Sequence, residues 1–138
     1  MSWSILIVDD SGLLRSQLRG LLEVKGARVT EAQDGNEGLW RARENLFDLV
    51  LTDIHMPRMD GVRMIEELRK LPQYAVTPIF VLTSDASSLR AQDGKRAGAN
   101  AWILKPLLPE LLWEAIEKTL SGPASKSLSA NPKVSGQT

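Results

Sequence analysis

Five short runs of mostly apolar residues recur along the chain, over residues 4–8, 27–32, 48–52, 78–84 and 101–105. They are rich in Ile, Val and Leu, and all but the weaker second run show little alternation between apolar and polar positions. Unbroken apolar runs of this length are typical of strands that are buried on both faces of a parallel sheet. The pattern therefore predicts five such strands.

Between these runs, apolar residues return at helical spacing, which predicts helices over residues 11–25, 36–46, 61–71, 87–97 and 109–120. The second helix, for example, would place Leu39, Ala42 and Leu46 on one face. Strands that alternate with helices predict an α/β fold, with a parallel sheet covered by helices on both faces.

The composition changes at residue 121. Residues 121–138 contain no aromatic or acidic residue and are rich in Ser, Pro and Gly. Such a segment buries too little apolar surface to fold by itself. We therefore expect one domain over residues 1–120, followed by a disordered tail over residues 121–138.

Composition and charge narrow the classes of function. The formal net charge is zero, which gives no electrostatic reason to bind nucleic acid or an anionic membrane. The absence of Cys excludes disulfides, thiolate catalysis and Cys-ligated metals. The start of the chain is unlike a signal peptide, and no apolar run is long enough to span a bilayer. A cytoplasmic protein is expected.

Polar residues follow four of the five predicted strands. Asp9 and Asp10 end the first strand, Asp53 follows the third, Thr83 ends the fourth, and Lys105 ends the fifth. In open α/β sheets, ligands bind beyond the carboxyl ends of the strands. Each residue has an ordinary interpretation by itself, such as a helix cap for Asp9 or β propensity for Thr83. Their shared position favours a common site.

Three carboxylates crowded at one end of a sheet would repel one another, and a hard divalent cation relieves that repulsion. Mg²⁺ prefers oxygen ligands, usually one or two carboxylates with waters and a phosphate. Asp9 and Asp10, side by side, suit a metal clamp, whereas Asp53 on the central strand is the best candidate for a nucleophile that forms an acyl phosphate. Lys105 and Thr83 would meet the remaining phosphate oxygens.

Four ordered motifs carry a family resemblance, namely LIVDDS (6–11), DLVLTDIHMPRMDG (48–61), FVLTS (80–84) and GANAWILKP (98–106). With them, the chain resembles the response-regulator receiver domains of two-component signalling over residues 4 to 120. The resemblance implies a flavodoxin-like, doubly wound, three-layer fold with strand order 2-1-3-4-5.

The resemblance also implies roles for the residues at the strand ends. Asp53 would be the phosphoacceptor, and Mg²⁺ would be held by Asp10, Asp53 and the backbone carbonyl of His55, with Asp9 acting through water. Thr83 and Lys105 would bind the phosphoryl group. The Lys105–Pro106 peptide bond would be cis.

Three further positions are expected to tune the switch. Receivers of this kind usually couple the residue at Thr83 to a Tyr or Phe on strand five, where this chain has Trp102. An indole donates only through Nε1, so Trp102 would serve as a switch residue, a partner contact or simple packing. His55 and Asp85 occupy positions that tune the lifetime of the phosphoryl group in the family.

The leading functional hypothesis is a stand-alone monomeric receiver that carries a signal from a histidine kinase to a protein partner, through the surface of the fourth helix, fifth strand and fifth helix. The partner would be a flagellar motor or a phosphotransfer protein, since no DNA-binding module follows residue 120. The alternative is a phosphorelay shuttle. A phosphatase of the haloacid-dehalogenase type is disfavoured. Its nucleophile follows the first strand in a DxD motif, whereas the first strand here is followed by Asp9, Asp10 and Ser11. A nucleotide-binding switch would need a GxxxxGK[ST] loop, which is absent.

Overall fold

The structure is a computed structural model that describes residues 2–122. Contacts between residues divide the chain into two units, residues 1–106 and 107–138, and each is described by itself. The tail expected over residues 121–138 lies outside the described residues, except for Ser121 and Gly122.

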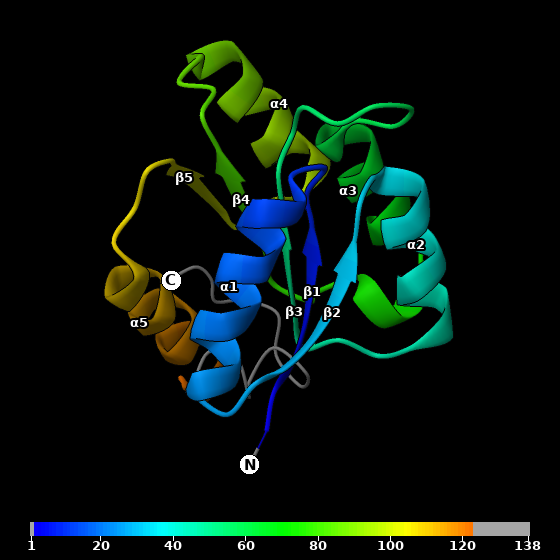
Figure 1. The fold of residues 1–138 in the computed structure, drawn as a ribbon. Coiled ribbons are helices and arrows are strands. Elements are labelled where there is room, and N and C mark those ends of the chain that lie inside the picture. The colour runs from blue at the N-terminus through cyan, green and yellow to red at the C-terminus, as the bar shows by residue number, and fades with distance from the viewer. Residues whose placement is uncertain (1, 123–138) are drawn as a thin grey trace. The chain divides into compact units, whose positions relative to one another are not determined.

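A five-stranded parallel sheet forms the centre of the first unit (Figure 1). Its strands are β1 (Ser4–Val8), β2 (Arg28–Ala32), β3 (Leu49–Thr52), β4 (Ile79–Thr83) and β5 (Ala101–Leu104). The order β2-β1-β3-β4-β5 confirms the order that the resemblance implied. Val8 pairs with Thr52, and Thr83 pairs with Leu104, so β1, β3, β4 and β5 all end at one end of the sheet. We call this the carboxyl end of the sheet.

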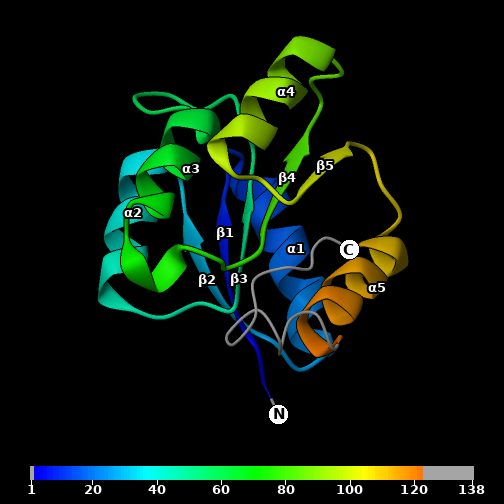
Figure 2. The same cartoon turned by 180° about the vertical axis from the view of Figure 1, so that it is seen from behind.

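Four helices of the first unit cover the two faces of the sheet. They are α1 (Gly12–Val24), α2 (Gly35–Glu44), α3 (Gly61–Arg69) and α4 (Ser88–Ala97). Figures 1 and 2 show α1 on one face, and α2, α3 and α4 on the other. A short 3₁₀ helix (Pro72–Tyr74) follows α3. In the second unit, the described residues include α5 (Pro109–Ser121), which begins at a Pro and corresponds to the helix predicted over residues 109–120.

Each helix of the first unit begins at a polar side chain that accepts a hydrogen bond from a backbone N–H in the first turn. The capping residues are Ser11, Asp34, Asp60 and Ser87. Such a cap pairs one of the N–H groups that a helix start leaves without a partner, and each stabilises its helix by about 1 kcal/mol. Because the caps lie directly after β1, β2, β3 and β4 or their loops, they bring the helix starts to the carboxyl end of the sheet.

The largest cluster of buried apolar side chains lies between the sheet and the helices α2 and α3. Val8, Val50 and Val81 contribute from the strands, and Met64 and Leu68 contribute from α3. The stripe predicted for the second helix is partly wrong. Leu39 and Ala42 are buried, but Leu46 is 73% exposed, because α2 ends at Glu44 and Leu46 lies beyond its last turn.

The guanidinium of Arg69 lies where α3 and α4 end, away from the carboxyl end of the sheet. It donates to the backbone carbonyls of Tyr74 at 2.6 Å, Thr77 at 2.7 Å and Gly98 at 2.7 Å, and to Oδ1 of Asn100 at 3.0 Å. Gly98 is the C-cap of α4 and has a φ of 119°, a conformation that favours glycine. Arg69 therefore joins the end of α3 to the end of α4.

Candidate functional site

Asp53 follows the central strand β3, at the carboxyl end of the sheet. The strand is buried along its whole length, and the backbone N–H of Asp53 donates to the carbonyl of Val8 at 3.0 Å. The Asp53 side chain is 13% exposed, and its Oδ1 accepts a hydrogen bond from the N–H of Ile54 at 2.6 Å. The carboxylate is thus held in place but remains accessible, as an acceptor of a chemical group must be.

Lys105 brings a positive charge to this carboxylate from β5. Its Nζ donates to Oδ2 of Asp53 at 3.1 Å and to Oδ2 of Asp9 at 3.2 Å. Asp9 is almost fully buried, and its other oxygen accepts from the N–H of Ser11 at 2.8 Å. The peptide bond between Lys105 and Pro106 is cis, as the resemblance implied. One ammonium therefore bridges two carboxylates that come from different strands.

The surroundings shift the pKa values of these groups in a consistent way. Burial raises the pKa of the Asp9 carboxyl above its usual 3.8, although the Ser11 N–H and the Lys105 ammonium oppose the shift. Burial alone would lower the pKa of Lys105, but the hydrogen bond to Asp53 and the charges of Asp9 and Asp53 outweigh it and raise the pKa above 10.5. Lys105 is therefore charged at neutral pH.

The predicted magnesium site is formed only in part. Asp9 and Asp53 both contact the Lys105 ammonium, and their carboxylates offer the hard oxygen ligands that Mg²⁺ prefers. Two carboxylates are enough when waters complete the coordination shell. Asp10, however, is exposed, and among residues 2–122 no three His, Cys, Asp or Glu side chains are grouped to hold a metal. The donor set of Asp9 and Asp53 fits the ion, and the part of Asp10 in holding it stays a prediction.

Thr83, at the end of β4, is fully buried beside the site. Its Oγ1 accepts a hydrogen bond from the backbone N–H of Asp85 at 3.2 Å. No hydrogen bond between Thr83 and Asp53 is formed, and the structure connects Thr83 instead to the loop that leads into α4. Thr83 is thus placed to transmit a displacement from the site to that loop.

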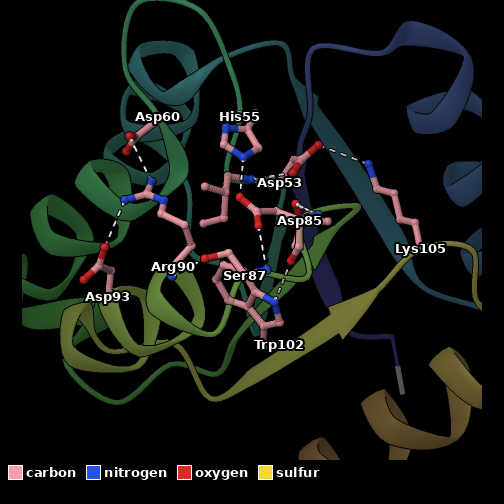
Figure 3. A network of polar contacts seen from close by, with 11 residues as sticks. Asp53, His55, Asp60, Asp85, Ser87, Arg90, Asp93, Trp102 and Lys105 are labelled. Atoms are coloured by element: carbon pink, nitrogen blue, oxygen red, sulfur yellow. Dashed lines mark hydrogen bonds and ion pairs between the residues drawn. The ribbon is translucent and has the colours of Figure 1, made fainter.

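His55 and Asp85 contact each other across the site, which sequence reasoning did not foresee (Figure 3). Nε2 of His55, in the loop after β3, lies 2.7 Å from Oδ2 of Asp85, in the loop after β4. This hydrogen bond, together with one from the N–H of Ser87, lowers the pKa of the Asp85 carboxyl below 3.8. Both residues had been expected near the phosphoryl group, but as two separate side chains.

Trp102 lies half-buried on β5, with its indole against α4. Its Nε1–H donates to the backbone carbonyl of Asp85 at 3.2 Å (Figure 3). A Cβ atom added at Gly94 of α4 would lie 2.8 Å from Cζ3 of the indole, so the missing side chain at Gly94 makes the room that this ring occupies. Trp102 therefore packs against the fold and also forms a polar contact with the loop after β4.

Two ion pairs that sequence reasoning missed hold the loop after β3. Arg58 has a φ of 68° and donates through Nε to Oδ2 of the buried Asp34 at 3.0 Å. Asp60, the cap of α3, pairs with Arg90 of α4 at 3.3 Å (Figure 3). The only signal in the sequence was the presence of opposite charges in loops, which does not identify the pairs.

Comparisons with known proteins agree with this geometry. Residues 5–117 match the response regulator receiver domain family. The chain is 35% identical to PilH of Pseudomonas aeruginosa over 118 residues, which cover 86% of this chain and 98% of PilH. It resembles the crystal structure of the chemotaxis response regulator CheY4 of Vibrio cholerae with a TM-score of 0.82 and 36% identity, covering 87% of this chain and all of that chain.

Other relatives are much longer than this chain. A gliding motility regulatory protein of Myxococcus xanthus is 38% identical over 115 residues, which cover 83% of this chain but only 15% of the relative. The resemblance to that protein is therefore limited to one of its segments. No helix within residues 2–122 combines the length and the apolar character needed to cross a membrane.

Proposed function

The chain belongs to the response regulator receiver family, and on this premise we propose that it is a switch that accepts a phosphoryl group on Asp53 from a histidine kinase. The observation that carries the proposal is the placement of the Asp53 carboxylate, held by the Ile54 N–H and paired with Lys105 at 3.1 Å, at the carboxyl end of the sheet. Receiver domains act as signalling switches, so turnover of a small substrate is not expected.

The transfer would use one oxygen of Asp53 as the nucleophile. This oxygen forms a bond to phosphorus while the bond from phosphorus to the kinase imidazole nitrogen breaks, and the electron pair leaves with the imidazole. Asp53 becomes an acyl phosphate. Lys105 Nζ, which already contacts Oδ2 of Asp53, would stabilise the negative charge on the transferred group, and the Thr83 hydroxyl would move toward it.

Asp10, Asp53 and the backbone carbonyl of His55 would hold Mg²⁺ directly, with Asp9 acting through water. The ion, when bound, neutralises charge on the phosphoryl oxygens. The residues present also act without it, because Lys105 bridges Asp9 and Asp53 and keeps two like charges together at the site. Burial raises the pKa of Asp9, and the charge of Lys105 opposes this shift.

The signal would leave through the surface of α4 and β5, together with α5, toward a protein partner. The support within the first unit is the contact between Trp102 and the loop after β4, because that loop also carries the amide that bonds Thr83. The match covers 98% of PilH and all of the CheY4 chain, so both relatives have the size of a single receiver domain. A chemotaxis-like role with a histidine kinase upstream follows from these similarities as a proposal. The cytoplasmic location and monomeric state stay predictions.

The proposal is tested by intact-mass spectrometry after incubation with acetyl phosphate and Mg²⁺. The wild type should gain one phosphoryl group, Asp53→Asn should gain none, and removal of the metal with EDTA should prevent the gain. Asp48→Asn is the matched control, because Asp48 lies just before the same strand, at its opposite end, and should be modified like the wild type. Modification of Asp53→Asn, or no modification of the wild type, would contradict the assignment of the site.

A further inference from the structure

Asp85 forms four hydrogen bonds with four other residues. Its N–H donates to Thr83 Oγ1 at 3.2 Å, its Oδ1 accepts from the N–H of Ser87 at 2.8 Å, and its Oδ2 lies 2.7 Å from His55 Nε2. Its carbonyl accepts from Trp102 Nε1 at 3.2 Å. Figure 3 shows Asp85 between His55 and Trp102.

These bonds connect three parts of the fold. His55 lies two residues after Asp53, in the loop after β3, and Trp102 lies on β5 at the surface proposed for output. The side chain of Asp85 contacts His55, and the backbone carbonyl of Asp85 contacts Trp102. A displacement of His55 that pulls on the Asp85 carboxylate therefore also moves the carbonyl that holds the indole.

The indole has little freedom to follow such a movement by sliding toward α4. The ring lies against Gly94, where even a Cβ atom would be 2.8 Å from Cζ3 and 3.1 Å from Cε3. The Nε1–H of Trp is a donor only, and the carbonyl of Asp85 is its partner. A shift of this carbonyl must therefore lengthen or break the bond to Trp102.

We propose that Asp85 is the positioning residue that links the phosphoacceptor loop to Trp102, with His55 holding it in the unmodified protein. The proposal rests on the proposed function for its biological role, but the link itself is a property of the unmodified fold. It gives His55 a task beyond its expected influence on the lifetime of the phosphoryl group, which is to fix the position of a residue on β5.

The link has a direction when Asp53 becomes phosphorylated. Movement of the Thr83 hydroxyl toward the phosphoryl group lengthens its bond from the Asp85 N–H, and so draws the loop after β4 with it. In the unmodified protein, the bond from His55 to Oδ2 keeps the Asp85 side chain beside the loop after β3 and so fixes the position from which this movement starts. Loss of the His55 contact should therefore loosen the Trp102 indole before any phosphorylation.

The test is the indole N–H resonance of Trp102 in ¹H–¹⁵N spectra of the full chain. The protein has four Trp residues, so the Trp102 cross-peak is assigned by its loss in Trp102→Phe. We expect His55→Phe, which keeps a ring but removes the donor, to shift this cross-peak and speed its exchange with water. His55→Gln keeps a side-chain N–H donor and is the matched control, which should leave the cross-peak close to its wild-type position.

Either of two results would overturn the link. One is an unchanged Trp102 cross-peak in His55→Phe, and the other is an equal shift in His55→Gln and His55→Phe. The side chain of His55 is 64% exposed, so neither change should unfold the protein, and the other three indole cross-peaks report on folding. His55→Ala, which removes the donor without adding bulk, should agree with His55→Phe.

A second arm separates this proposal from the proposed function. Acetyl phosphate and Mg²⁺ are added, and mass spectrometry records the phosphorylated fraction of each sample. The shift of the Trp102 cross-peak on phosphorylation should be smaller in His55→Phe than in the wild type, because the bond is already loosened. An equal shift in both would contradict the link. Absence of phosphorylation would instead count against the proposed function and leave the result of the first arm intact.

Discussion

Strands β3 and β5 both deliver a charged residue to the site, but their surroundings differ greatly. β3 lies at the centre of the sheet, and Leu49, Val50 and Leu51 are all 0% exposed. β5 is an edge strand of the sheet, and its Leu104 is 46% exposed. The proposed phosphoacceptor Asp53 thus follows a strand that is buried along its whole length, and its cationic partner Lys105 follows a partly exposed one.

The difference teaches how one small domain combines a precise site with a surface that is able to respond. Close packing on both faces of β3 makes displacement of Asp53 costly. β5 has a partner strand on one side only, and the indole of its Trp102 donates one hydrogen bond to a carbonyl of the loop after β4. A displacement at the site should therefore meet less resistance at β5 than at β3. The predictions below test this contrast, from the largest expected effect to the smallest.

The largest expected difference between β3 and β5 is in how much each strand contributes to the free energy of unfolding. Leu51→Ala leaves a cavity in the closely packed centre and should lower the free energy of unfolding by about 3 kcal/mol. Leu104→Ala removes the same atoms from a half-exposed position and should cost less than about 1 kcal/mol. Urea unfolding followed by circular dichroism measures both. Equal losses would show that β5 is as constrained as β3.

The second prediction concerns the loop that leaves β3. An added Cβ at Gly61 would lie 2.1 Å from the backbone oxygen of Asp53, so Gly61→Ala must push the loop away, at a cost of about 3 kcal/mol. Gly20→Ala, in α1, is the matched control, because nothing lies within 4 Å of its Cβ. It should stabilise the protein by up to about 1 kcal/mol. Comparable unfolding curves for the two variants would contradict the close approach at Gly61.

The third prediction uses the buried cap Asp34. Bonds from the N–H of Glu37 and from Arg58 hold the pKa of Asp34 below its usual 3.8. Its charge therefore stabilises the fold fully above that value, and this contribution is lost as the pH falls through the lowered pKa. Asp34→Ala should cost about 2 kcal/mol at neutral pH, through loss of the cap and of the Arg58 contact.

The acid side of this prediction is checked with Asp34→Asn, which keeps an oxygen for the cap but has no titrating charge. The stability difference between the wild type and Asp34→Asn, followed by urea unfolding at several pH values, should be full near neutrality and shrink below pH 3.8. If the stability difference grew as the pH fell, the pKa of Asp34 would not be lowered by folding, which would contradict the stabilising role given to its charge.

The smallest effect is expected for the pair between Asp60 and Arg90, which joins the loop after β3 to α4 at 3.3 Å. Both side chains are partly exposed, so a double-mutant cycle with Asp60→Asn and Arg90→Ala should give a coupling energy of about 0.5 kcal/mol, reduced by salt. Asn at position 60 retains the cap of α3. A coupling above about 2 kcal/mol would mean that α4 is fixed to the site as firmly as β3.

The sequence predicted the strands well, because short apolar runs that alternate with helical patterns are typical of a parallel sheet. The expected burial on both faces was wrong for β5, which is only partly buried. The run at 48–52 differs by one residue from β3, and the run at 4–8 coincides with β1. The wrong placement of Leu46 has a simple cause. Helical spacing continues past Glu44, but the chain leaves α2 there with an extended Asn45, and periodicity alone does not reveal such an ending.

The site was predicted as a set of residues but not as a set of contacts. Asp53, Asp9 and Lys105 were expected together because strand ends of a parallel sheet must meet, and these three residues do. The pair of His55 and Asp85 joins two loops 30 residues apart in the sequence, and its geometry depends on loop conformations such as the positive φ of Arg58. Local sequence does not encode these conformations in a readable pattern.

The anchor that Arg69 provides at Gly98 has a mechanical consequence. It fixes α4 at its C-terminal end, while the N-terminal end of the helix is tied by the Arg90 pair and by the loop of Asp85. A ten-residue helix held in this way is a lever about 15 Å long with its pivot at Gly98. A rotation of about 10° around this pivot would carry the Ser88 end through about 2.5 Å while the Ala97 end stayed almost still. Under the proposed function, a small displacement beside Asp53 would therefore move the Ser88 end of α4 more than the Ala97 end, and a partner that binds α4 would meet one mobile end and one fixed end.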